Sequence, residues 1–448
     1  TVMASPLIGA LRRTFPEAHI AWLLEPHLID LLRHHTALDE VIPWPKARWL
    51  DLARRRRVPA LCAEIRQLRK SLVSKGFDLT IDAQGLLRSR ILARLSGAAE
   101  RVGFESKEPG RWLMTKTVSK GPESTRISSE YLHLAQVLGL DTVAFQPDLA
   151  VSPKDDASAG HKLTERGIRG PYAAFCPFTT RPQKHWLAPR WADLVQRLRT
   201  ELDLPTVMLG GPADRRAAAE IRTLTRTLPG IQVDLVDLVD LVGETSLLEA
   251  AALIHRAALV VAVDTGLGHM GIAFARPSLL LFGSTCPYRN TTRDNARVLY
   301  HRLACSPCKR RPTCNGAFTC MRMIEVGEVL TAGPAAVAAS KTGFYAQTLR
   351  YLVEQDLRDG TLVHPVEKLP DLLATDLFEG HTVAPLPPLF DSAGVCVPSS
   401  PGRGPRTKVI GHHSFEIRRH LPSSSAAGAC SMPDPPGRWH RVSHHAVF

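Results

Sequence analysis

Short apolar segments alternate with segments of helical character over the first 332 residues, and this alternation restricts the fold more than any other feature. Strands separated by helices pair in parallel, so the sequence predicts an α/β protein with two parallel-sheet domains. The first series has predicted strands at 19–24, 40–44, 77–82 and 101–104, with helices at 6–15, 27–33, 61–74 and 87–96. The second has strands at 172–177, 205–209, 232–238, 260–263 and 278–282, with helices at 191–201, 214–227 and 246–255.

The local composition of the chain predicts where its domains begin and end. We expect a first domain at 1–150, a linker at 151–171 where Pro, Gly and acidic residues gather, and a second domain at 172–332. Beyond 333 the periodicity fades, and ten prolines fall within 380–448, so residues 333–448 are expected to be a largely irregular, poorly ordered extension. No apolar run reaches the ~20 residues of a membrane span, and no signal peptide precedes the first helix, which favours a cytoplasmic protein.

The segment 260–275, VVAVDTGLGHMGIAFA, indicates an anion site. It has the pattern of a buried strand that ends at Asp264-Thr265-Gly266 and leads into a helix. The first N–H groups and the dipole of such a helix favour a bound phosphate. Gly266 and Gly268 would let the backbone approach a ligand closely. The alternative is a turn that only packs the strand against the helix.

The same segment spells G-x-G-x-x-G from Gly266 to Gly271, which is also the fingerprint of a dinucleotide-binding turn. That fingerprint requires an acidic residue at the end of the next strand, and 278–282 is followed instead by Gly283-Ser284. A phosphate-binding turn that is not of the NAD type is therefore favoured. Beside a bound anion Asp264 needs a task of its own, such as accepting hydrogen bonds from sugar hydroxyls. His269 is either a phosphate donor or a core histidine.

A second anion-binding segment is predicted directly after the strand at 172–177. It reads Thr179-Thr180-Arg181-Pro182-Gln183-Lys184 and supplies two hydroxyls, free N–H groups and a lysine. The compact charge of lysine suits a diphosphate, whereas a polar loop without a ligand is the alternative. Thr179, Gly210, Gly243 and Asp264 all follow predicted strands, where ligands of such sheets bind.

The net charge of +13 is concentrated before residue 333, because the remainder has 11 Lys and Arg against 10 Asp and Glu. Its densest run is Arg54-Arg55-Arg56-Arg57. No nucleic-acid motif or aromatic stacking platform accompanies this run, so nucleic acid is not an expected partner. An acidic substrate or an anionic membrane surface fits better, and a solvated helix face is the alternative.

Four of the nine cysteines form a C-x2-C-x5-C-x5-C pattern at Cys305, Cys308, Cys314 and Cys320. Without a secretion signal, free thiols are expected. The first pair has common zinc-ligand spacing, but the second pair is five residues apart. The cluster is therefore either a structural zinc site or a reduced loop, and no cofactor is expected.

Taken in their order along the chain, these segments resemble glycosyltransferase family 9, the bacterial lipopolysaccharide heptosyltransferases. The resemblance covers residues 1–332 and implies a GT-B fold, with two Rossmann-like domains facing a cleft and an inverting, metal-independent transfer. It implies ADP-heptose as the donor and the Kdo or heptose region of the lipopolysaccharide core as the acceptor. The matching segments are LRRTFP (11–16), DLTIDAQGLLRS (78–89), TTRPQKHW (179–186), GGP (210–212), GETSL (243–247), DTGLGH (264–269) and FGST (282–285).

The resemblance also implies roles for residues on the donor and the acceptor side. The donor diphosphate would be bound by the side chains of Thr179, Thr180 and Lys184 and by the backbone of Thr265, Gly266 and Leu267, beside His269 as the candidate phosphate donor. Asp264 would hold the heptose hydroxyls, and Thr245, Ser246 and Leu247 would lie near the adenosine. The run Arg54, Arg55, Arg56 and Arg57 would contact the acidic acceptor, with the protein peripheral to the anionic inner membrane.

One departure concerns catalysis. Members of the family begin with a strand and a Gly-Asp turn whose Asp is the general base, whereas 1–6, TVMASP, resembles the segment that follows this turn. The base is therefore expected before Thr1 and is not assigned within this sequence. The alternative function is a nucleotide-binding protein of the same fold without transferase activity.

Overall fold

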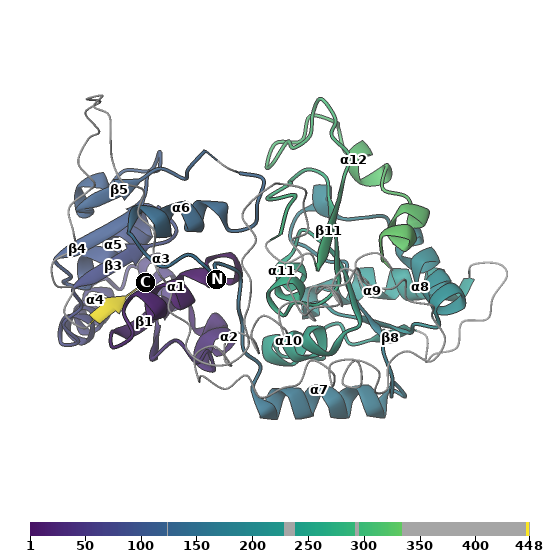
Figure 1. The fold of residues 1–448 in the computed structure, drawn as a ribbon, viewed down its shortest axis with the longest axis horizontal. Helices are drawn as coiled ribbons and strands as arrows, with labels where there is room; N and C mark the ends of the chain where they lie inside the picture. The colour runs from purple at the N-terminus through teal and green to yellow at the C-terminus, as the bar shows by residue number, and fades with distance from the viewer. Residues whose placement is uncertain (123, 228–237, 292–294, 334–444, 448) are drawn as a thin grey trace, which may run out of the picture. The chain divides into compact units, whose positions relative to one another are not determined.

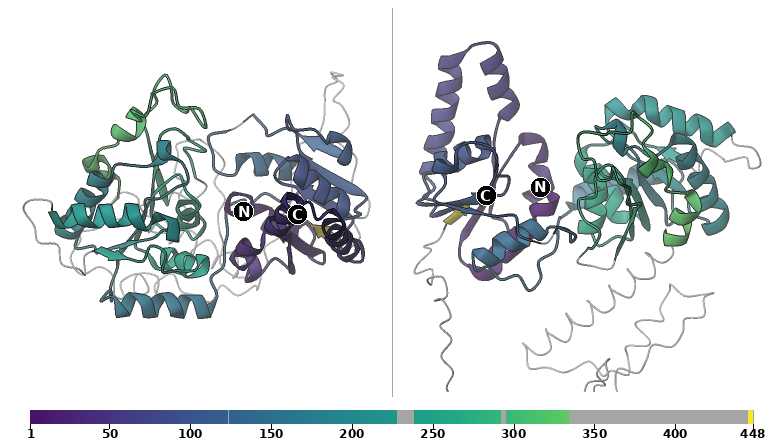
Figure 2. Two further views of the ribbon diagram at one scale, coloured as in Figure 1. Left: turned by 180° about the vertical axis from the view of Figure 1, so that it is seen from behind. Right: turned by 90° about the horizontal axis from the view of Figure 1, so that it is seen from above.

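The described residues form two six-stranded parallel sheets, which confirms the α/β prediction (Figures 1 and 2). The structure is a computed structural model that describes residues 1–448 except 123, 228–237, 292–294, 334–444 and 448. The expected irregular extension therefore lies mostly outside the described residues. None of the described helices is both long and apolar enough to span a bilayer.

The first sheet has the strand order β2-β1-β12-β3-β4-β5. Its strands are β1 (His19–Leu24), β2 (Glu40–Pro43), β3 (Leu79–Asp82), β4 (Glu100–Phe104), β5 (Lys116–Val118) and β12 (His445–Val447). The accompanying helices are α1 (Pro6–Thr14), α2 (Asp30–Arg33), α3 (Lys46–Arg54), α4 (Val58–Val73), α5 (Leu87–Leu95) and α6 (Ser129–Val137), with 3-10 turns η1 (Val2–Ala4), η2 (Pro26–Leu28) and η3 (Arg111–Leu113).

The second sheet has the order β11-β10-β9-β6-β7-β8. Its strands are β6 (Ala173–Cys176), β7 (Thr206–Met208), β8 (Leu238–Asp240), β9 (Leu259–Val263), β10 (Ser278–Phe282) and β11 (Ala296–Tyr300). The accompanying helices are α7 (Pro153–Glu165), α8 (Ala188–Leu202), α9 (Arg215–Thr227), α10 (Leu247–Arg256), α11 (Gly266–Ala273) and α12 (Thr319–Arg322), with 3-10 turns η4 (Pro182–Lys184) and η5 (Pro212–Asp214).

The inner strands are buried on both faces, which explains their continuous apolar sequences. Every residue of β3, β6, β9 and β10 is buried. In the second sheet Trp191 of α8 is packed against Phe175 of β6 and against Trp186, with ring centroids 4.9 and 5.0 Å apart. A parallel strand covered by helices on both faces has no solvent-facing side, so its residues need not alternate between apolar and polar.

The segment 151–171, expected to be a linker, contains the helix α7. Ser152 is the N-cap of α7, and its hydroxyl accepts a hydrogen bond from the N–H of Asp155 at 3.1 Å. Pro153 occupies the first turn together with Asp155 and Asp156. Proline and acidic residues are favoured at the start of a helix, so the composition that suggested a linker is a helix start signal.

Several further elements differ from the sequence prediction. β5 and α6 were not predicted, and β8 begins at Leu238, the last residue of the strand predicted at 232–238, whose other residues lie outside the described part. β12 at the end of the chain is inserted between β1 and β3, although 333–448 was expected to be irregular. It pairs in parallel with both neighbours, with Ala446 opposite Ile20 on one side and Leu79 on the other.

Candidate functional site

Three loops meet at the carboxyl ends of adjacent strands in the second sheet. Because β9 lies between β10 and β6, the residue that follows β9, Asp264, is flanked by the loops after those two strands. The loop after β6 carries Lys184 and the loop after β10 carries Thr285. The structure thus brings together the two segments that the sequence singled out, and it adds Thr285, to which the sequence analysis had assigned no role.

Asp264 is the centre of a polar network. One carboxylate oxygen, Oδ2, lies 2.6 Å from the ammonium of Lys184 and also accepts a hydrogen bond from the hydroxyl of Thr285. The other oxygen lies 3.5 Å from Nε2 of His269. Burial by itself raises the pKa of the Asp264 carboxyl, but the hydrogen bonds from His269, Lys184 and Thr285 outweigh burial and hold this pKa well below its usual value. Asp264 is therefore a carboxylate that stays ionised.

His269 is oriented by a buried tyrosine. Its Nδ1 lies 2.8 Å from the hydroxyl of Tyr288, which is fully buried, and the two rings are 5.5 Å apart. Burial is the main cause that raises the pKa of Tyr288 well above its usual value, so the phenol stays neutral. With one ring nitrogen toward Tyr288 and the other toward Asp264, His269 belongs to the polar network, which favours a role in the site over that of an isolated core histidine.

The start of α11 has the geometry of an anion site. Thr265 is the N-cap, but its side chain makes no capping hydrogen bond, so the first N–H groups of this eight-residue helix have no side-chain acceptor there. Gly266 is exposed, and a Cβ added at this position would meet no heavy atom within 4 Å. The backbone at Gly266 is therefore open to a ligand, and the binding of a phosphate there stays a prediction.

Gly268 does not have the function that the sequence suggested. An added Cβ at Gly268 would lie 2.8 Å from Cβ of Ala262 in β9 and 2.9 Å from Leu280 in β10. At Gly271 an added Cβ would lie 2.6 Å from the hydroxyl of Ser278. Because Gly268 and Gly271 have no side chain, α11 can pack closely on the sheet. Of the three glycines in α11, Gly266 is the one that faces open space.

The loop after β6 is held in place by three hydrogen bonds. His185 Nε2 lies 2.8 Å from the carbonyl of Thr179, the Gln183 amide donates to the carbonyl of Lys309 at 3.3 Å, and the Trp186 indole donates to the carbonyl of Ile324 at 2.9 Å. These anchors leave Thr180 exposed. Lys184 points to Asp264 and not to solvent, since the Lys184 side chain is 17% exposed.

Ser246 has a structural task that the sequence analysis missed. It is the N-cap of α10: its hydroxyl accepts from the N–H of Glu249 at 3.1 Å, while the Glu249 carboxylate accepts from the N–H of Ser246 at 2.8 Å. This capping box is visible in the sequence as Ser-x-x-Glu. The neighbouring Thr245 and Leu247 are half-buried, and a position of these three residues near adenosine stays a prediction.

The arginine run is a connection between two helices. α3 and α4 form a helical hairpin (Figure 2). α3 ends at Arg54, α4 begins after Arg57, and all four arginines of the run are exposed. Arg55 is paired with Asp51 at 2.9 Å, one turn earlier. The run therefore presents its charges at the end of the hairpin and not along one helix face.

The cysteine cluster contains free thiols. Cys305 is exposed, Cys308 and Cys314 are half-buried, and Cys320 is buried. Burial is the main cause that raises the pKa of the Cys308 and Cys320 thiols. Within the described part of the chain, no three or more His, Cys, Asp or Glu side chains are arranged to hold a metal ion. The structural zinc site and the reduced loop therefore both stay predictions.

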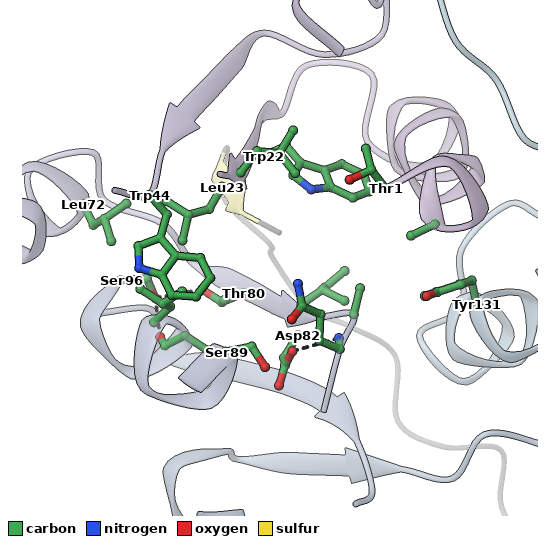
Figure 3. Close-up of a pocket in the computed structure, with 17 residues that line it drawn as sticks. Thr1, Trp22, Leu23, Trp44, Leu72, Thr80, Asp82, Ser89, Ser96 and Tyr131 are labelled. Carbon is green, nitrogen blue, oxygen red and sulfur yellow. Dashed lines mark hydrogen bonds between the residues drawn. The ribbon is translucent and has the colours of Figure 1, made fainter. Parts of the chain in front are cut away.

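A pocket with a volume of about 120 Å³ lies beside the first sheet. Figure 3 shows Asp82, at the end of β3, among the side chains that line it, which include Trp22 and Trp44. Asp82 accepts hydrogen bonds from the N–H groups of Gln84 and Gly85 at 2.9 and 3.1 Å through Oδ1, while its Oδ2 is buried without a partner among the described residues. No role for Asp82 was predicted from the sequence.

Comparison with known proteins identifies the family. Residues 65–318 match glycosyltransferase family 9 (heptosyltransferase). Over 297 residues the chain is 28% identical to lipopolysaccharide heptosyltransferase 1 of Salmonella typhimurium, covering 63% of this chain and 84% of the relative. The fold is similar to a family 9 glycosyltransferase from Veillonella parvula, with a TM-score of 0.63, 20% identity and coverage of 75% of this chain and 93% of that chain.

A second solved structure agrees with the first. The fold is similar to E. coli ADP-heptose lps heptosyltransferase II, with a TM-score of 0.59, 21% identity and coverage of 76% of this chain and 96% of that chain. The family match covers more than half of the 448 residues and includes Lys184, Asp264 and Thr285. Two parallel sheets, a polar network at the carboxyl ends of three strands and this match lead to one conclusion: the chain belongs to glycosyltransferase family 9, the heptosyltransferase family.

Proposed function

We propose that this protein transfers heptose from ADP-heptose to a sugar of the lipopolysaccharide core. The proposal is supported by membership of a heptosyltransferase family and by relatives named as lipopolysaccharide heptosyltransferases. The observation that carries it is the network in which Asp264, ionised and held by Lys184 and Thr285, lies beside the uncapped start of α11. Cations and N–H groups beside a carboxylate suit a ligand with both a diphosphate and a hydroxyl-rich sugar.

In the proposed reaction an acceptor hydroxyl attacks the anomeric carbon of the heptose from the face opposite ADP. The bond between that carbon and the ADP phosphate oxygen breaks, and ADP leaves with the bonding electrons. The hydroxyl proton passes to a general base, which we assign to no residue of the described chain. This displacement inverts the anomeric configuration.

The leaving ADP gains negative charge as the bond breaks, and stabilising that charge is the main electrostatic requirement of the step. Lys184 and the N–H groups of Gly266 and Leu267 supply positive charge and hydrogen-bond donors for the diphosphate, and Thr179 and Thr180 add hydroxyls. We propose that these groups take the place of a metal ion. The carboxylate of Asp264 accepts hydrogen bonds from the heptose hydroxyls and so distinguishes ADP-heptose from ADP.

Calorimetry with ADP and ADP-heptose, followed by an assay of ADP release in the presence of lipopolysaccharide core acceptor, tests this function. We expect both nucleotides to bind and ADP to be released only when acceptor is present. Binding of ADP without transfer to any core acceptor would favour the alternative, a nucleotide-binding protein without transferase activity. If neither nucleotide bound, the proposed function would be wrong.

Lys184→Ala is expected to weaken ADP binding by about 1.5–3 kcal/mol, or roughly ten- to a hundredfold in Kd, because it removes a charge-assisted contact with the diphosphate. Since Lys184 is already paired with Asp264 in the free protein, the lower part of this range is favoured. Titration calorimetry measures the change. Lys154→Ala, which removes an exposed lysine of α7, is the matched control. An unchanged ADP affinity in Lys184→Ala would exclude Lys184 from the donor site.

Replacing Arg54, Arg55, Arg56 and Arg57 by serine is expected to raise the acceptor KM and to leave ADP-heptose affinity unchanged. The contribution of such exposed charges is electrostatic and is screened over about 8–10 Å at physiological salt. The salt dependence of binding to anionic vesicles should therefore become weaker as well. Serine at Arg310 and Arg311, which are also exposed, serves as the control. Wild-type acceptor kinetics together with wild-type vesicle binding would show that the run is only a solvated turn.

A further inference from the structure

A second pocket lies at the amino ends of the strands of the second sheet, whereas Asp264 lies at their carboxyl ends. Its volume is about 740 Å³. Its lining includes Tyr172, directly before β6, His255 in the last turn of α10, and Arg276, two residues before β10. A strand advances about 3.3 Å per residue, so the length of β9 places this pocket roughly 16 Å from the donor-side edge. It is therefore separate from the proposed donor site.

Arg276 brings an uncompensated positive charge to this pocket. Its side chain is half-buried, its Nε is buried without a hydrogen-bond partner, and none of the ion pairs among the described residues includes it. Burial lowers the pKa of Arg276, which reflects the cost of holding a charge away from water. A buried donor without an acceptor is unfavourable, so this guanidinium has unused capacity for an anion.

The only carboxylate in the pocket lining is used by another arginine. Asp156 of α7 binds Arg256 in a bidentate pair, with distances of 2.7 and 2.6 Å. The Arg256 guanidinium lies over Gly160, where an added Cβ would be 3.4 Å away from it. Because the Arg256–Asp156 pair is internally neutral, the charge of Arg276 and that of the exposed Arg169 are left without a counter-charge in the lining.

His255 adds a further unsatisfied group. Its Nδ1 is buried and has no hydrogen-bond partner among the described residues, and its ring contacts Phe274 with centroids 5.2 Å apart. Among the lining residues, Arg276 thus has a buried donor without an acceptor, and the His255 ring nitrogen is a second donor when its tautomer places the proton there. A ligand that satisfies them must offer several acceptor oxygens and negative charge, which describes a phosphate better than a neutral sugar.

We propose that this pocket binds a phosphate group, held by the guanidinium of Arg276 with Arg169 and His255 as further partners. A guanidinium pairs with two phosphate oxygens at once, which gives orientation as well as charge neutralisation. The volume exceeds that of a free phosphate and accommodates a small group esterified to it. Occupancy of this pocket does not depend on the proposed transfer of heptose.

Calorimetric titration with inorganic phosphate, in a phosphate-free buffer that contains saturating ADP, tests the proposal. ADP occupies the anion site at α11, so heat from added phosphate reports the second pocket. We expect Arg276→Gln to weaken phosphate binding about tenfold or more and Arg169→Gln to weaken it about twofold to fivefold. Arg297→Gln removes an exposed arginine of β11, outside the pocket, and should leave binding unchanged.

Two further arms complete the experiment. Arg276→Lys keeps the charge but not the two-pronged geometry and should bind phosphate with intermediate affinity, which also covers the case that Arg276→Gln does not fold. Tighter binding of glycerol 3-phosphate than of inorganic phosphate would identify an ester as the ligand, and the reverse order would identify the free ion. If ADP failed to bind, the difference in phosphate affinity between wild type and Arg276→Gln would still report this pocket, because the site at α11 is the same in both proteins. Equal phosphate affinity in wild type, Arg276→Gln and Arg169→Gln, or no binding to wild type, would overturn the proposal.

Discussion

Asp264→Ala is expected to weaken ADP-heptose binding by about 1.5–3 kcal/mol, or roughly ten- to a hundredfold, while leaving ADP affinity equal or higher. The two nucleotides should respond differently because the carboxylate is proposed to bind the sugar, whereas it only competes with the diphosphate for Lys184, 2.6 Å away. Removing the carboxylate frees this lysine and removes a negative charge beside the anion site. Calorimetry of both nucleotides with wild type and variant measures the contrast.

Asp264→Asn is the companion variant because it keeps the shape of the side chain and removes only the charge. It should resemble Asp264→Ala in its effect on ADP and should lose less ADP-heptose affinity, since the amide oxygen still accepts a hydrogen bond. Asp203→Asn, at a side chain that is 89% exposed, is the control for removal of a charge elsewhere in the second half. Parallel loss of ADP and ADP-heptose affinity in both Asp264 variants would contradict a role of this carboxylate toward the sugar.

The stability of the Asp264 network should depend on pH in a defined direction. The pKa of Asp264 is lower in the folded protein than in the unfolded chain, so the unfolded chain binds the proton more readily. The network therefore contributes its full stability at neutral pH and loses it as the pH falls below about 4, the ordinary value for aspartate. Unfolding of wild type and Asp264→Asn by urea should give a stability difference that is constant near neutral pH and shrinks below pH 4.

Gly268→Ala is expected to destabilise the protein by about 1–3 kcal/mol, whereas Gly266→Ala, two residues away, should leave stability unchanged or slightly increased. An added methyl group at Gly268 would lie 2.8 Å from Ala262 and 2.9 Å from Leu280, so α11 would have to move away from the sheet. At Gly266 it would meet no atom, and alanine is a better helix residue than glycine.

Ligand binding should separate the same two variants in the opposite sense. A methyl group at Gly266 stands where the diphosphate is proposed to approach the start of α11, so Gly266→Ala should weaken ADP binding although it folds normally. Gly268→Ala should lower the melting temperature, and at a temperature where it is folded it should bind ADP with a smaller loss than Gly266→Ala. A stable Gly268→Ala, or a Gly266→Ala with unchanged ADP affinity, would show that the roles of these glycines have been assigned wrongly.

The second sheet shows how far local sequence leads. Continuous apolar runs such as 259–263 and 278–282 predict buried parallel strands, because a strand covered on both faces has no alternating pattern. The end of such a strand at Asp264, followed by glycine and a helix, is likewise a local signal. The capping box at Ser246 and the start of α7 at Ser152 are local too, and each could have been predicted from the hydrogen-bonding preferences of Ser, Asp and Glu alone.

Contacts between segments that are distant along the chain could not be predicted from local sequence patterns. The pairing of Lys184 with Asp264 joins residues 80 positions apart and follows from the order of β6, β9 and β10 in the sheet, which local patterns do not encode. The position of β12 between β1 and β3 is the extreme case, since this three-residue strand comes from the opposite end of the chain.

The range of the interactions therefore separates the features that the sequence determined from those that the tertiary structure decided. Strand and helix formation, helix caps and the turn from β9 into α11 depend on interactions within a few residues, and the sequence determined them. Which glycine faces a ligand and which one faces the sheet depended on the packing of α11 against β9 and β10. Lys184 compensates the charge of Asp264, whereas Arg276 has no counter-charge in its pocket. Both facts depended on through-space distances that only the folded chain sets.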